Sequence, residues 1–105
     1  MRAKSKKQKF HPLVGSWVNG DEYATEVEYT IARPANGFTV RAVDRYDGEE
    51  GRVYEVSYDD KNEALSFNVY WESTGRFVRA KIEAISQNRI SYTYSFTESQ
   101  MWFRK

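Results

Sequence analysis

The chain contains no cysteine, one histidine and two prolines among its 105 residues. The absence of cysteine excludes disulfide bonds and thiolate chemistry, and nothing in the composition indicates an oxidising compartment. A single histidine without cysteine excludes the common zinc constellations, which need several such ligands. No apolar run approaches the length of a membrane span. The sequence therefore predicts a protein with no metal, no other cofactor and no membrane span.

The motifs of common enzyme classes are also missing. The chain has no Gly-x-Ser-x-Gly nucleophile motif, no phosphate-binding P-loop and no dinucleotide fingerprint. The histidine, His11, stands before the first predicted strand without an obvious catalytic partner, and we interpret it as a surface residue. We therefore predict that the protein is not an enzyme and has no catalytic residues.

Charge is distributed unevenly along the chain. Five positive charges fall within the first nine residues, on Arg2, Lys4, Lys6, Lys7 and Lys9. Without them, 11 basic residues face 15 acidic ones, although the whole chain has a formal net charge of +1. We predict a disordered basic tail over residues 1–10 that lacks the apolar stretch of a secretory signal, and hence a cytoplasmic protein. Such a tail could contact nucleic acid or an anionic surface, but the acidic remainder opposes nucleic-acid binding.

Apolar and polar residues alternate through most of the remaining chain, as in β-strands with one buried face. The segment 64–71 shows this most clearly, with Leu65 and Phe67 on one face and Ser66 and Asn68 on the other. Turn residues recur about every ten positions. Residues 11–105 are therefore predicted to form one all-β domain, with strands at about 13–19, 24–33, 38–46, 52–58, 64–71, 76–85, 89–96 and 100–104.

Short loops between these eight segments predict an antiparallel meander. A flat sheet of eight strands would leave two open edges and an uncovered apolar face, and no helix is predicted to cover that face. Closure into an up-and-down β-barrel removes both problems, so we predict an eight-stranded antiparallel barrel. The alternative is a sandwich of two sheets.

The first predicted strand carries the motif Gly15-Ser16-Trp17, preceded by Pro12. This motif resembles the Gly-x-Trp signature of the calycin superfamily, which comprises lipocalins, fatty-acid-binding proteins and avidins. The resemblance implies a minimal calycin-like (lipocalin-like) barrel over residues 13–105. It also implies barrel closure by Gly15, Trp17 and Arg104, with the arginine of the last strand lying across the tryptophan. The chain departs from the family in having no C-terminal helix, no helical lid and no avidin-like hydroxyl-rich loop.

An eight-stranded barrel encloses a lumen wide enough for side chains or one small ligand. The predicted inward face is rich in tyrosine, whose hydroxyl needs a hydrogen bond or water. It also includes one carboxylate, that of Asp44. Polar groups that converge in an apolar cavity are typical of ligand sites. We therefore predict a non-enzymatic barrel that binds a small, largely apolar molecule through eight residues, namely Trp17, Tyr29, Asp44, Tyr46, Tyr54, Trp71, Tyr92 and Tyr94.

The loops expected at the mouth of this barrel are acidic. They cover residues 20–23, 47–51, 72–75 and 97–100, and they contain seven carboxylates and no basic residue. A mouth of this charge favours a neutral or cationic ligand over a fatty-acid carboxylate.

A second interpretation stays open, in which aromatic side chains simply fill the lumen and Asp44 faces water at the rim. The protein would then be a solid-cored barrel that acts as a protein-interaction or oligomerisation module. Under either interpretation we expect a monomer or a homodimer. Its contact face would consist of the outward apolar residues Val43, Tyr70, Phe77, Ile85 and Trp102.

Overall fold

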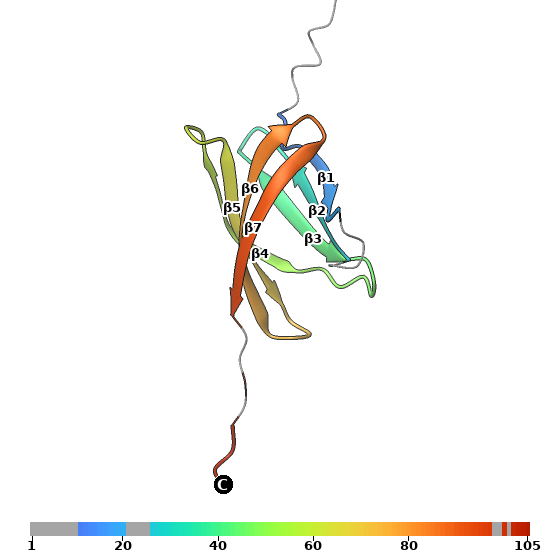
Figure 1. The fold of residues 1–105 in the computed structure, drawn as a ribbon, viewed down its shortest axis with the longest axis vertical. Helices are drawn as coiled ribbons and strands as arrows, with labels where there is room; N and C mark the ends of the chain where they lie inside the picture. The colour runs from blue at the N-terminus through green and yellow to red at the C-terminus, as the bar shows by residue number, and fades with distance from the viewer. Residues whose placement is uncertain (1–10, 21–25, 98–99, 101) are drawn as a thin grey trace, which may run out of the picture.

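The computed structural model describes residues 11–20, 26–97, 100 and 102–105, which form seven strands in two antiparallel sheets and no helix (Figure 1). The first sheet has the order β1-β2-β3 and consists of β1 (Gly15–Val18), β2 (Val27–Ala32) and β3 (Thr39–Asp44). The second has the order β4-β5-β6-β7 and consists of β4 (Arg52–Asp59), β5 (Ala64–Trp71), β6 (Arg76–Ser86) and β7 (Arg89–Thr97). The predicted all-β antiparallel architecture is confirmed, and the described part of the chain holds no helix that could cross a membrane.

The sheets do not close into a barrel, and the prediction of eight strands is wrong. Residues 100 and 102–105 belong to no strand, and Trp102 and Phe103 are 84% and 83% exposed. Among the described strands, β1 pairs only with β2 and β7 only with β6. Because β1 has four residues and β7 has nine, direct pairing would leave most of β7 without partners. Both strands are therefore open edges in the part of the chain that the structure describes. The predicted tail over residues 1–10 lies outside the described residues.

The chain crosses from the first sheet to the second through a tight loop after β3. The Asp44 N–H donates to the Glu49 carbonyl at 2.8 Å, and the Gly51 N–H donates to the Ala42 carbonyl at 2.9 Å. Only one isolated bridge, at Val43, joins β3 to this loop. The ladder is therefore interrupted here, and the two sheets turn to face each other.

Gly51 allows this crossing because the loop lies directly against the second sheet. A Cβ atom at Gly51 would lie 2.5 Å from Cγ1 of Val69 and 3.3 Å from the ring of Trp71. Val69 is fully buried and Trp71 is nearly so, which leaves no room for either to move away. Only glycine fits a backbone that approaches neighbouring side chains this closely.

The two sheets pack face to face around one apolar core, as in the sandwich alternative. The inward positions of β2, β5 and β6 follow the predicted alternation, and Phe67 lies at the centre with its ring 5.3 Å from that of Tyr29 on the opposite sheet. The buried cluster consists of Leu13, Tyr29, Ile31, Ala42, Leu65, Phe67, Val69, Trp71, Val78, Ala80 and Ile82. Burial of this surface is the main favourable contribution to folding.

β4 is the strand in which the alternation fails. Its register against β5 shifts by one residue between Tyr54 and Ser57, and Glu55 adopts a φ of 55°. This β-bulge reverses the direction of the side chains, so that Val53 packs on the core before it and Val56 packs on the core after it. Tyr54 consequently lies on the outer face and is 44% exposed, away from the lumen in which it was predicted.

His11 is partly buried and has a structural role that the sequence did not predict. Its Nδ1 accepts the Leu13 N–H at 3.2 Å, so the neutral ring carries its proton on Nε2, which donates to the Tyr58 hydroxyl at 3.0 Å. The ring also meets Phe38 and Tyr58 edge-on, at centroid distances of 5.0 and 5.3 Å. His11 therefore anchors the segment before β1 to the second sheet.

We expect the free energy of unfolding to fall as the pH drops below 6.5. Burial, followed by the nearby positive charge of Arg33, lowers the pKa of His11 below its ordinary value of 6.5. The unfolded chain therefore binds a proton at His11 more tightly than the folded chain does. The contribution of neutral His11 to the free energy of unfolding is complete above pH 6.5 and is lost as the pH falls through the folded-state pKa. Urea unfolding between about pH 7.5 and pH 5 measures this dependence. His11→Gln should flatten that part of the profile, and an unchanged slope in this variant would show that other groups cause it.

Candidate functional site

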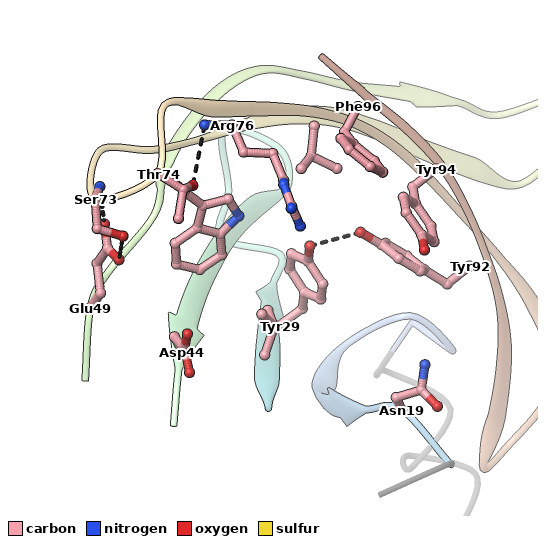
Figure 2. A pocket seen from close by; sticks show the side chains of 13 residues that line it. Asn19, Tyr29, Asp44, Glu49, Ser73, Thr74, Arg76, Tyr92, Tyr94 and Phe96 are labelled. Atoms are coloured by element: carbon pink, nitrogen blue, oxygen red, sulfur yellow. Dashed lines mark hydrogen bonds between the residues drawn. The ribbon is translucent and has the colours of Figure 1, made fainter. Parts of the chain in front are cut away.

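A cavity of about 290 Å³ opens between the two sheets, at the end where β1, β3 and β5 finish (Figure 2). Two of the loops expected at the mouth, 47–51 and 72–75, contribute to it. Its lining comprises Asn19, Val27, Tyr29 and Asp44 from the first sheet and its ends, Trp71, Arg76, Val78, Tyr92, Tyr94 and Phe96 from the second, and Glu49, Ser73 and Thr74 from the loops.

A second hollow of about 330 Å³ adjoins the cavity along the seam between β1 and β7. The two spaces share five lining residues, including Tyr29 and Tyr92, and the second reaches Trp17 and Ile90. Because β1 and β7 do not pair, this space follows an open seam and is not a closed lumen. We call the two spaces together the cleft.

A pair of tyrosines joins the two sheets inside the cleft. The hydroxyl oxygens of Tyr29 and Tyr92 lie 2.8 Å apart, as the dashed line between them in Figure 2 marks. One hydroxyl donates this bond, so the accepting hydroxyl keeps its own hydrogen for another acceptor. Burial raises the pKa of both tyrosines, which keeps them neutral at physiological pH. The pair therefore offers the cleft an uncharged hydrogen-bond donor.

Two carboxylates lie at the mouth of the cleft, and they differ in what they can bind. Both oxygens of Glu49 accept hydrogen bonds from Ser73, at 3.1 Å from the backbone N–H and 2.6 Å from the hydroxyl. In Asp44, Oδ1 accepts the Tyr46 N–H at 2.9 Å. No described residue bonds the second oxygen of Asp44, whereas Glu49 holds the two mouth loops together.

One arginine reaches into the same space. The guanidinium of Arg76 lies 4.5 Å from the centroid of the Phe96 ring and points into the cavity (Figure 2). Stacking of this kind holds a guanidinium in place over an aromatic face. Among the described lining residues, two carboxylates against one guanidinium give the cavity a net negative charge.

The wall formed by β7 is aromatic and partly uncovered. Tyr92, Tyr94 and Phe96 occupy alternate positions of the strand, and their neighbouring rings lie 5.4 and 6.4 Å apart with nearly parallel planes. Tyr94 and Phe96 are 58% and 49% exposed because the first sheet does not extend over this half of β7. Planar aromatic surface is therefore available to a ligand in the cleft.

Most of the residues predicted from the sequence to bind a ligand line the cleft. Tyr29, Asp44, Trp71, Tyr92 and Tyr94 line the cavity, and Trp17 lines the adjoining hollow. Tyr46 does not, because β3 ends at Asp44 and the next residues form a turn in which Tyr46 is 85% exposed. Tyr54 is excluded by the bulge in β4.

The predicted closure residues do not meet. Gly15 begins β1 opposite Ile31, and the indole N–H of Trp17 donates to the Leu13 carbonyl at 2.9 Å. Arg104 is exposed and belongs to no strand, so it does not close a barrel over Trp17.

Sequence reasoning missed Arg76 as a site residue. Arg76 has the same parity along β6 as Val78 and Ala80, which are both buried. Extending the period of two back from Val78 to Arg76 would have placed this side chain inward.

No protein-family model matches this chain, and no curated protein or solved structure matches it either. Within the described ranges, no group of three or more His, Asp or Glu side chains could hold a metal ion. The fold and the cleft define the chain as a two-sheet, all-β domain with an open, aromatic-lined cavity.

Proposed function

We propose that this protein is a non-enzymatic binding domain that takes a small, largely apolar, planar molecule, neutral or cationic, into the cleft. The observation that carries the proposal is the convergence of Trp71, the Tyr29–Tyr92 pair and Asp44 on one cavity between the sheets. Ligand pockets combine such apolar walls with a few placed polar groups. A cavity of about 290 Å³ suits a ligand of one or two fused rings.

Each group has a distinct part in this mode of binding. The rings of Trp71 and Tyr92 offer faces on which a planar molecule can stack. The tyrosine pair can donate to a ligand acceptor, and the remaining oxygen of Asp44 can accept from an ammonium group. The negative balance of the cavity disfavours a ligand carboxylate.

The Gly15-Ser16-Trp17 motif and the meander order also support a wider proposal. We infer that the chain is an opened relative of the calycin barrels and that it works in the cytoplasm. The seam between β1 and β7 would then give a ligand access from the side.

Isothermal titration with three ligands that share one ring system tests the binding proposal. We expect 1-naphthylmethylamine and 1-naphthylmethanol to bind, and 1-naphthoate to bind about tenfold more weakly because of the negative cavity. Asp44→Asn keeps an oxygen for the Tyr46 N–H and should weaken only the amine, by about fivefold to tenfold. Trp71→Leu should weaken all three ligands.

The matched control is Glu72→Gln, which removes a nearby carboxylate that pairs with Arg52 on the surface, outside the cavity lining. It should leave all three affinities unchanged. Tightest binding of the naphthoate, or an equal effect of Asp44→Asn and Glu72→Gln on the amine, would contradict the proposal.

A further inference from the structure

The outer edge of β7 is long and unprotected. No described strand pairs with it, so it presents a row of unpaired backbone N–H and C=O groups over nine residues. Natural sheets blunt such edges with charges, prolines or bulges. β7 contains no proline, and its only charged residue is Arg89 at one end.

β4, at the opposite edge of the same sheet, has the protective features that are missing along most of β7. β4 is bulged at Glu55 and carries charged residues at Arg52, Glu55 and Asp59. These features prevent another strand from adding to β4. β7 has serine and threonine on its outer face, no bulge of its own, and a single charge, Arg89, at its end.

The inner face beside this edge is apolar and uncovered. Tyr94 and Phe96 point to the same side as the buried residues of β6, yet about half of each remains exposed. An added strand would satisfy the backbone groups of the edge and cover these rings at once.

We propose that β7 pairs in antiparallel fashion with β7 of a second copy of this chain, about a two-fold axis at Thr93. The pattern of β7 is self-complementary in this register. All nine residues pair, and any other axis leaves part of the strand unpaired. Such a closed, isologous contact cannot continue into a fibre through the same edge.

The pairs formed in this register are chemically matched. On the inner face, Tyr92 lies opposite the partner's Tyr94, and Ile90 lies opposite the partner's Phe96. On the outer face, Ser91 lies opposite the partner's Ser95. Arg89 meets the partner's Thr97, so no like charges meet, and aromatic cross-strand pairs are among those that stabilise sheets.

The pairing also extends the cleft. A two-fold axis perpendicular to the sheet keeps the inner faces of both copies on the same side. The partner's Tyr92 therefore stands beside Tyr94 and lengthens the aromatic wall of the site described above. This inference does not depend on the proposed ligand, because the edge and its register define the contact by themselves.

Sedimentation of the full chain over a range of concentrations, without ligand, tests the dimer. We expect a reversible monomer–dimer equilibrium that Thr93→Glu shifts toward the monomer, with the dissociation constant raised about tenfold or more. Within one copy the introduced carboxylate lies opposite Lys81 on β6, which favours the folded monomer. Across the axis the same carboxylate faces the introduced glutamate of the partner, and the two like charges repel each other.

Ser95→Glu is the matched control. Its carboxylate lies opposite Arg79 within one copy and opposite the partner's Ser91 across the contact, so the dimer should persist. Thr93→Glu and Thr93→Lys should associate with each other more tightly than either does with itself, and thermal melts verify that both fold. A wild-type protein that stays monomeric, or a dimer that both glutamate variants affect equally, would overturn the proposal.

Discussion

Gly51→Ala is expected to lower the free energy of unfolding by about 1–3 kcal/mol, the range in which overpacking of a closed core falls. The new methyl group would lie 2.5 Å from Cγ1 of Val69, which is fully buried and cannot move aside. Relief requires the loop to withdraw from the second sheet, which strains the hydrogen bond from the Gly51 N–H to the Ala42 carbonyl. Urea or thermal unfolding followed by circular dichroism measures the loss.

Gly20→Ala is the matched control for this substitution. A Cβ atom at Gly20 meets nothing within 4 Å, so the same change there should leave stability within about 0.5 kcal/mol of the wild type. Equal effects of the two substitutions would show that the crossing between the sheets does not depend on the close approach at Gly51.

Phe67→Ala is expected to destabilise the protein by about 3–5 kcal/mol, the usual cost of truncating a buried phenylalanine. The side chain is 1% exposed and contacts the ring of Tyr29 across the two sheets. Its removal costs the transfer free energy of the ring and leaves a cavity between sheets that are joined by a single loop. Because small domains have stabilities of about 5–15 kcal/mol, this variant approaches the limit of folding.

Phe96→Ala is the comparison for Phe67→Ala, since it removes the same ring from a position where the side chain is 49% exposed. In the monomer we expect a loss of only about 1 kcal/mol, because half of that ring contacts water there. A cost at Phe96 that equals the cost at Phe67 would mean that the uncovered half of β7 is buried in solution, as the proposed dimer would require. Repeating the measurement at a concentration where the protein is monomeric shows whether that burial comes from the dimer or from the monomer itself.

The alternation of apolar residues predicted the buried faces of β2, β5 and β6 because a regular strand keeps period two from end to end. The same rule failed at β4, where the bulge at Glu55 shifts the register by one residue. Glycine often marks a bulge of positive φ, but here the position holds glutamate, so the sequence carries no signal of the shift. Tyr54 was therefore predicted on the wrong face.

Closure of the barrel could not be judged from local pattern. Residues 100–104 alternate like a strand, but so short a segment forms a strand only if a partner edge receives it, which is a long-range property. The prediction that Tyr46 faces inward extended the alternation of side chains beyond Asp44. It was wrong because β3 ends at Asp44. The site residues that were predicted correctly, such as Tyr29 and Trp71, lie inside regular strands.

The cleft is tested most directly by an NMR titration of the full, ¹⁵N-labelled chain with 1-naphthylmethylamine. The chain has three tryptophans, whose indole N–H signals report on three places. Trp71 lines the cavity, Trp17 lines the adjoining hollow, and Trp102 is 84% exposed and lines neither. We predict saturable shifts that are largest for Trp71, smaller for Trp17 and absent for Trp102, together with shifts of the backbone amides of Asp44 and Tyr92. Shifts confined to Trp102, or no saturable shift of Trp71, would contradict binding in the cleft.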